Sequence, residues 1–85
     1  MFLHIGGDVV LPLREILGVF DASLEKTSEI TAQYIRGAQS EGRIRNLSPR
    51  KPKSIVVTGK VIYLSPISAP TLKKRTEEAY AGKIQ

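Results

Sequence analysis

The chain has 85 residues, of which 41% are hydrophobic and 25% charged, a composition typical of one globular domain and not of a disordered segment. It contains no cysteine and a single histidine, His4, which excludes disulfides, thiolate-bound zinc and a histidine-rich metal site. No apolar stretch reaches the roughly 18 residues of a membrane-spanning helix, and segment 1–8 lacks the features of a signal peptide. We therefore expect residues 1–85 to form one cytoplasmic domain, with self-association as the available way to stabilise a small core.

The first part of the chain predicts three short strands. Phe2–Ile5 alternates apolar and polar residues and precedes the turn signal Gly6-Gly7-Asp8. Residues 9–11 form a second apolar run, which Pro12 ends because proline has no N–H to donate to a central strand. Residues 15–20 predict the third strand. The proline marks a sheet edge, and an unpaired edge is a template for pairing with another subunit.

A helix is predicted next, after a polar connection over residues 21–26. Apolar residues recur at helical spacing between about 28 and 40. Thr27 or Ser28 suits the N-cap, and Gly42 suits the left-handed position that follows the last turn.

The second half predicts three more strands and a second helix. The strands are expected at residues 43–47, 54–58 and 60–64, the last two forming a hairpin around Gly59. The helix is expected over residues 70–81, ending at Gly82. The order is β-β-β-α-β-β-β-α, and strands joined by short turns are typical of antiparallel sheets. We therefore expect an α+β fold in which two helices pack on a small antiparallel sheet.

Charge is divided unevenly along this sequence of net charge +5. Residues 1–42 carry three basic and six acidic side chains, whereas residues 43–85 carry ten basic and two acidic ones. Segment 43–53 contains five cations and no acid. Its last part, residues 48–53, contains two prolines that forbid a helix or a central strand, so we expect an exposed, stiff loop, here called the basic loop. Such asymmetry indicates an acidic partner for the second half of the chain.

The charge of the basic loop leaves three interpretations open. Its cations can neutralise nucleic-acid phosphates and release condensed counterions. They can equally bind an acidic protein or lipid surface, or only keep the loop hydrated without binding a partner. Arg14 has two interpretations of its own: an ion pair with Glu15 or Asp8, or a position beside the basic loop in the folded chain.

No catalytic constellation is present in the sequence. His4 is the sole histidine, and its position on a terminal strand favours a structural or surface role over a serine–histidine–aspartate triad. The chain contains no phosphate-cradling Gly-Lys-Ser/Thr motif. We therefore expect a protein that is not an enzyme, with no catalytic residues, cofactor, metal or small-molecule substrate.

Five segments give the chain a family resemblance. They are Phe2–Gly6, Arg14–Asp21, Pro52–Thr58, Ile62–Ser68 and Thr71–Arg75, and together they span nearly the whole sequence. The strings Lys-Ser-Ile-Val-Val-Thr and Ser-Pro-Ile-Ser, the latter followed by Thr-Leu-Lys-Lys-Arg, are the most specific. In these segments the chain resembles the small bacterial extracellular-matrix regulatory proteins of the RemA/RemB family, and the RemB branch more than the RemA branch.

The resemblance implies a DNA-binding transcriptional regulator of biofilm and matrix genes that lacks a helix-turn-helix. Proteins of the RemA branch assemble into closed rings and contact DNA around the ring through arginines. Arg14 matches one such arginine, and Arg50 and Lys51 match a basic pair in the loop before the hairpin, with Lys53 as a further cation. Lys51 stands where the pair has a second arginine, so the planar donor group is absent there.

Two hypotheses from different classes follow. The first is a homo-oligomer that binds the backbone of double-stranded DNA through Arg14, Arg50, Lys51 and Lys53, repeated on every subunit. The second is a non-enzymatic scaffold that binds an acidic protein. RNA is a weaker third, because Phe2, Phe20 and Tyr63 lie in apolar strand patterns and not on an exposed stacking platform.

Overall fold

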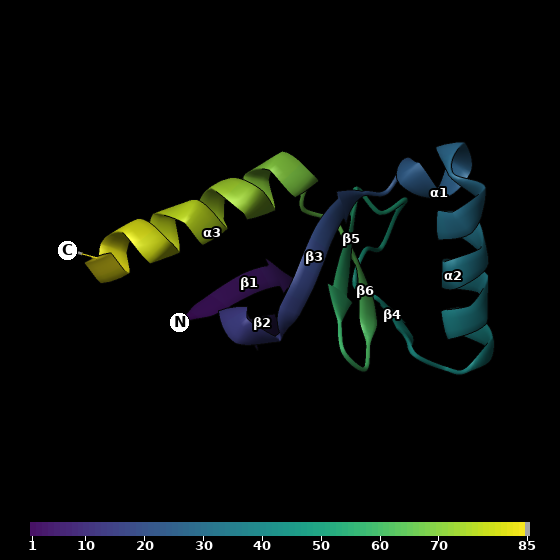
Figure 1. The fold of residues 1–85 in the computed structure, drawn as a ribbon, viewed down its shortest axis with the longest axis horizontal. Helices are drawn as coiled ribbons and strands as arrows, with labels where there is room; N and C mark the ends of the chain where they lie inside the picture. The colour runs from purple at the N-terminus through teal and green to yellow at the C-terminus, as the bar shows by residue number, and fades with distance from the viewer. Residues whose placement is uncertain (85) are drawn as a thin grey trace.

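The computed structural model describes the backbone of residues 1–84 and the side chains of residues 1–79, and its α+β architecture confirms the predicted fold class. Figure 1 shows the arrangement of the helices and strands. In chain order the elements are β1 (Phe2–Gly6), β2 (Val9–Pro12), the 3-10 turn η1 (Leu13–Glu15), β3 (Ile16–Asp21), α1 (Leu24–Thr27), α2 (Glu29–Ser40), β4 (Ile44–Asn46), β5 (Ser54–Thr58), β6 (Ile62–Ser65) and α3 (Ala69–Ile84). None of the helices within residues 1–84 is long and apolar enough to cross a lipid bilayer.

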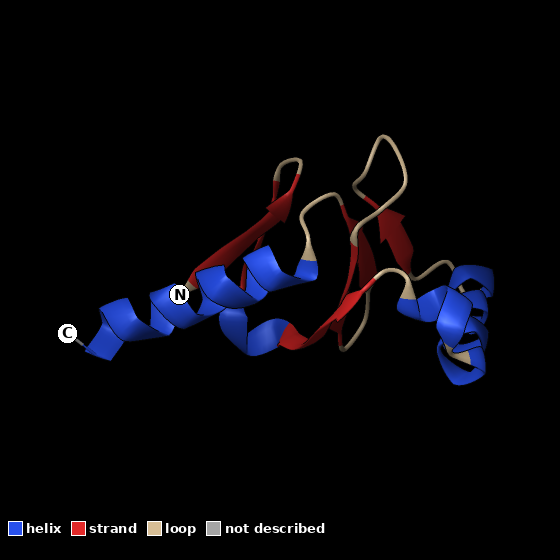
Figure 2. Ribbon diagram, turned by 90° about the horizontal axis from the view of Figure 1, so that it is seen from above, coloured by secondary structure: helices blue, strands red, loops and turns tan. Residues whose placement is uncertain are grey.

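The strands form two sheets and not the single antiparallel sheet that the sequence predicts. β1 and β2 make an antiparallel hairpin of their own, and the other four strands lie in the order β3-β5-β6-β4. β4 runs parallel to β6, with Ile44 opposite Ile62 and Asn46 opposite Leu64. The reason is the connection after β4, which carries the chain over the end of β6 before β5 begins. The basic loop therefore crosses one end of the four-stranded sheet (Figure 2).

Each face of this sheet has its own hydrophobic core, because side chains alternate between the two faces of a strand. On one face Val56 packs with the hairpin residues Leu3 and Ile5 and with Leu72 of α3. On the other face Ile55 and Ile62 pack against Ile35 and Ala38 of α2. Figure 1 accordingly shows the hairpin and α3 on one side of the sheet and α2 on the other.

Buried serine hydroxyls join the hairpin and the α3 connection to the sheet. Ser65 is fully buried, and its Oγ donates a hydrogen bond to the carbonyl oxygen of Ile5 in β1. Ser54 is also fully buried, and its Oγ donates to the carbonyl oxygen of Ile67 at 2.7 Å. These bonds satisfy the carbonyl of the fully buried Ile5 and that of the half-buried Ile67.

Replacing Ser65 by alanine is expected to lower the free energy of unfolding by about 1–3 kcal/mol, because the Ile5 carbonyl then loses its partner inside the protein. Urea denaturation followed by circular dichroism measures the change. Ser40→Ala is the matched control, since the Ser40 hydroxyl donates to the Gly37 carbonyl in an exposed position. Equal stability of the two variants would contradict a structural role for the Ser65 hydroxyl.

Two helical details differ from the prediction, and two agree with it. The connection 21–26 contains the start of α1, and α3 continues past Gly82 to Ile84. The N-cap of α2 is Ser28, whose Oγ accepts a hydrogen bond from the Thr31 amide at 3.2 Å. Gly42 follows α2 with a φ of 72°, which confirms its left-handed conformation.

Candidate nucleic-acid interface

The basic loop is held by hydrogen bonds along its length. Asn46 Oδ1 accepts from the Ser48 amide at 2.9 Å, and Ser48 Oγ accepts from the Arg50 amide at 3.3 Å. At its end, the Lys53 amide donates to the Ser65 carbonyl at 2.8 Å, and the Lys53 carbonyl accepts from the Ala22 amide at 3.0 Å. Because Lys53 bonds to the ends of both β6 and β3, the loop has a defined position at this end of the sheet.

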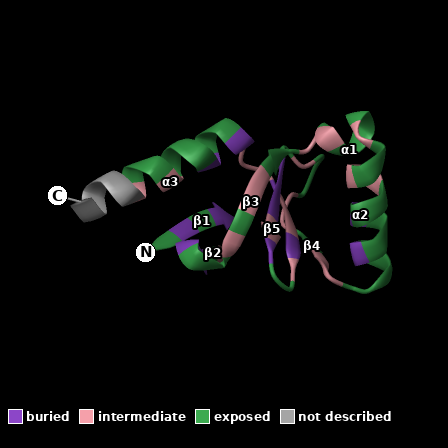
Figure 3. Ribbon diagram, viewed as in Figure 1, coloured by how far each residue is buried: buried purple, intermediate pink, exposed green. Residues whose placement is uncertain are grey.

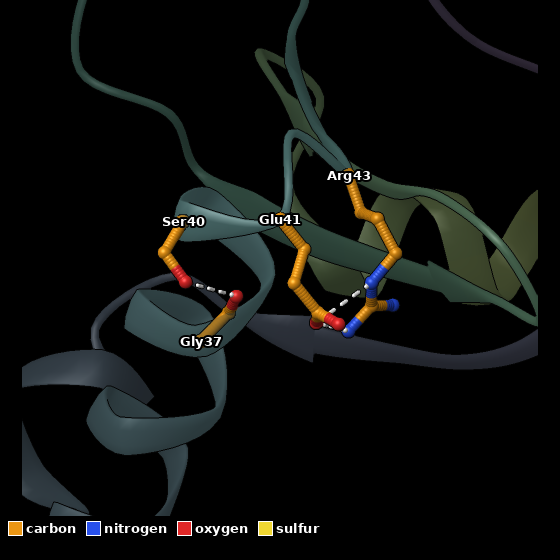
Figure 4. Close-up of polar contacts among 4 residues, drawn as sticks. All are labelled: Gly37, Ser40, Glu41 and Arg43. Carbon is orange, nitrogen blue, oxygen red and sulfur yellow. Dashed lines mark hydrogen bonds and ion pairs between the residues drawn. The ribbon is translucent and has the colours of Figure 1, made fainter.

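The side chains of Arg50, Lys51 and Lys53 are exposed on the basic loop. Arg43, in contrast, is neutralised before the loop begins. Its Nε and Nη2 donate to Glu41 Oε1 at 3.1 and 2.9 Å (Figure 4), and this pairing raises the pKa of the Arg43 guanidinium above its ordinary value. Of the five cations in segment 43–53, Arg43 is therefore already paired with a carboxylate and is not free to bind an external anion.

A groove of about 650 Å³ lies between the basic loop and helices α1 and α2. Four cations line it: Lys26 of α1, Arg36 of α2, and Lys51 and Lys53 of the basic loop. Lys26 and Lys51 both line the groove, and the interaction with Lys26 lowers the pKa of Lys51 below its ordinary value. The groove therefore brings two like charges together from different segments of the chain.

The acidic residues of the groove, Asp21 and Glu25, form no ion pair with these lysines among the described residues. Asp21 Oδ1 accepts hydrogen bonds from the amide and the Oγ of Ser23, at 2.9 and 2.7 Å, and these bonds lower the pKa of the Asp21 carboxyl. Within the part of the chain that the structure describes, the ion pairs are Arg36–Glu29 at 3.7 Å and Arg43–Glu41 at 2.9 Å. Lys26, Lys51 and Lys53 accordingly have no carboxylate partner among the described residues.

Arg14 lies at the other end of the sheet from the basic loop. It is exposed in η1, directly before β3, and lines a shallow groove with Lys60 in the β5–β6 turn. In the antiparallel pair of β3 and β5, Ile16 is opposite Thr58 and Asp21 is opposite Ser54. The length of β5, roughly 13 Å at about 3.3 Å per residue, thus separates the two positions. The prediction that folding places Arg14 beside the basic loop is wrong within one subunit, and Arg14 also makes no ion pair with Glu15 or Asp8 among the described residues.

An apolar surface lies along β3 and α2, formed by Leu17, Phe20, Ile30 and Tyr34, which are 71%, 44%, 81% and 46% exposed. Three of them line a groove of about 330 Å³ with Ile55 and Val57 of β5. The Phe20 ring lies over Gly18, where an added Cβ would come within 2.7 Å of it. Figure 3 shows the exposed outer part of α2 and the partly exposed β3. β3 is also an edge strand, with β5 as its neighbour in the sheet.

Lys26 and Arg36 are not among the residues that the sequence predicts for the site. Lys26 falls in the connection that was expected to be irregular, and its four-residue helix is too short for a periodic signal. Arg36 lies on the exposed side of α2, where a charged residue is ordinary. Only the register of β3 against β5 brings α1 to the same end of the sheet as the basic loop.

A family model and a known protein match this chain over most of its length. Residues 2–76 match the model of the family described as extracellular matrix regulatory protein A-like. Extracellular matrix regulatory protein B of Bacillus subtilis (strain 168) is 38% identical over 77 residues, which cover 91% of each chain. The matched region includes η1, the basic loop and the first half of α3. The chain therefore belongs to the RemA-like family of extracellular matrix regulatory proteins.

Proposed function

We propose that the protein regulates transcription of matrix genes as a cytoplasmic homo-oligomer that binds the backbone of double-stranded DNA through a repeated basic surface. The observation that carries the proposal is the cluster of exposed cations at one end of the sheet, Arg50, Lys51 and Lys53, which have no carboxylate partner among the described residues. Unpaired Lys and Arg side chains that displace condensed counterions supply most of the non-specific affinity for DNA. Backbone contacts position a protein, and sequence preference then comes from DNA shape and deformability.

Self-association supports this function because one subunit offers few phosphate contacts. Several linked subunits convert weak individual contacts into high affinity. The apolar surface on β3 and α2 and the unpaired edge of β3 are the features that a second copy of the chain would cover. None of the residues that line its groove belongs to the basic loop.

Arg14 is a separate contact point in this proposal. Because roughly a strand length lies between Arg14 and the basic loop, the single variants Arg14→Ala and Lys51→Ala are expected to weaken DNA binding independently. The free-energy losses of the two variants should add to that of the double variant within about 0.5 kcal/mol. Fluorescence anisotropy with one duplex measures all four proteins. A double variant no weaker than the poorer single variant would contradict two separate contacts.

The proposal is tested with the purified full chain and a fluorescent DNA duplex, titrated over a series of KCl concentrations. Binding is expected to weaken steeply with salt and to depend little on base sequence. A protein that scaffolds an acidic partner would instead bind no DNA in this titration, and its purified form would show the 260/280 nm absorbance ratio of a protein without nucleic acid. Absence of DNA binding by the folded protein would overturn the proposed function.

A further inference from the structure

We propose that Lys26 and Lys51 together bind one phosphate of the DNA backbone in the groove between α1 and the basic loop. This proposal rests on the proposed function and adds to it a contact from a separate element, α1. Two further cations, Arg36 and Lys53, line the same groove, and Arg36 also pairs with Glu29 at 3.7 Å.

The first argument is that two like charges line one groove. The charge of Lys26 repels that of Lys51 and lowers the pKa of Lys51. A phosphate oxygen placed between them attracts both and removes the repulsion. Asp21 and Glu25 also line the groove, but neither forms an ion pair with Lys26 or Lys51 among the described residues.

The second argument is that the fold holds both lysines in place. Lys51 lies between Pro49 and Pro52, in a loop whose end is bonded to β6 and β3 through the Lys53 backbone. Lys26 lies on α1, which follows the turn that Asp21 and Ser23 close. A site that is ordered before the ligand arrives loses less entropy on binding. The groove volume of about 650 Å³ also lies within the range of ligand sites, roughly 300–1,000 Å³.

The third argument selects DNA as the source of the phosphate. Arg50, the other cation of the basic pair, precedes Lys51 in the basic loop and is also exposed, so that the loop carries a further cation next to a groove-lining residue. A duplex backbone presents phosphates in series and matches such a run of charge. The acidic side chains of another copy of this chain are fewer than its basic ones and are separate in sequence, apart from the adjacent pair Glu77 and Glu78.

The test compares Lys26→Gln with Lys74→Gln, which removes the same charge from an exposed position on α3. Anisotropy titrations at several KCl concentrations give the slope of log affinity against log salt for each protein. Loss of one phosphate contact in each engaged subunit should reduce this slope by about 0.9 per subunit. Lys74→Gln should leave it unchanged. Both variants replace exposed side chains, and circular dichroism verifies their folding.

A second readout follows the Lys51 ammonium itself by NMR titration. In the free protein, Lys26→Gln is expected to raise the pKa of Lys51 toward its ordinary value, because the neighbouring charge is gone. In the wild-type protein, addition of DNA is expected to raise the pKa of Lys51 as well, because a phosphate favours the charged form. Both shifts support the shared phosphate position.

Three results would overturn the inference while leaving the proposed function in place. The first is a Lys26→Gln variant whose slope of log affinity against log salt equals that of the wild type. The second is a Lys74→Gln variant whose slope falls as much as that of Lys26→Gln. The third is a Lys26→Gln variant whose mass by light scattering changes while its DNA affinity does not. The last result would assign the groove to a carboxylate of another copy. Wild-type protein that binds no duplex at any salt concentration would instead overturn the proposed function and, with it, the DNA contact.

Discussion

Replacement of both Arg50 and Lys51 by alanine is expected to weaken DNA binding by more than about 100-fold. Two charge-assisted contacts, at roughly 1.5 kcal/mol each, are lost in every subunit that touches the duplex. The fold is expected to remain intact, because both side chains are exposed and the backbone bonds of Lys53 anchor the loop. Fluorescence anisotropy at low salt measures the affinity, and light scattering verifies that the oligomer is unchanged.

The matched control for this double variant is Lys73→Ala with Lys74→Ala, which removes the same charge from exposed positions on α3. A general effect of net charge would lower the affinity of both proteins equally. A local contact at the basic loop lowers only that of the Arg50 and Lys51 variant. DNA binding retained by that variant at the wild-type level would exclude the basic loop as the binding surface.

Ile30→Glu is expected to dissociate the oligomer into single subunits. Ile30 is 81% exposed in the described chain, so the substitution places a carboxylate on the apolar surface without disturbing either core. Removing an apolar anchor from the centre of an interface typically costs about 2 kcal/mol or more, and a desolvated carboxylate adds to this loss. Light scattering over a concentration series measures the mass, and DNA affinity should fall with it as multivalency is lost.

Gln33→Glu is the control for the apolar surface, because it adds the same charge to an exposed position on the same helix. Gln33 is not among the residues of the apolar groove. The Gln33 variant is therefore expected to keep the wild-type mass. An Ile30→Glu protein that also keeps the wild-type mass would show that subunits meet elsewhere.

Local sequence signals predicted most of the secondary structure. The β-branched run Ser54–Thr58 forms β5, Ser28 caps α2, and Gly42 has the left-handed conformation that ends it. Each of these features depends on residues that are neighbours in sequence. The four-residue helix α1 was missed because one turn gives no periodicity, and Gly82 did not end α3, which reaches Ile84.

Features that depend on distant parts of the chain were beyond sequence reasoning. Nothing in residues 43–47 indicates that β4 pairs with β6 in a parallel direction, since the same alternation suits an antiparallel partner. The distance between Arg14 and the basic loop follows from the register of β3 and β5, which no residue encodes alone. The same register brings Lys26 to Lys51, and so the groove became visible only in the folded chain.

The placement of β6 between β4 and β5 also bears on the folding of the molecule. The basic loop joins two strands that do not touch each other, and both of them dock on a strand that comes later in the chain. Contacts between residues far apart in sequence form slowly, because the chain must first close a loop. The Lys53 amide can bond to the Ser65 carbonyl only once β6 is in place, so the basic loop takes its final shape late in the folding of the chain.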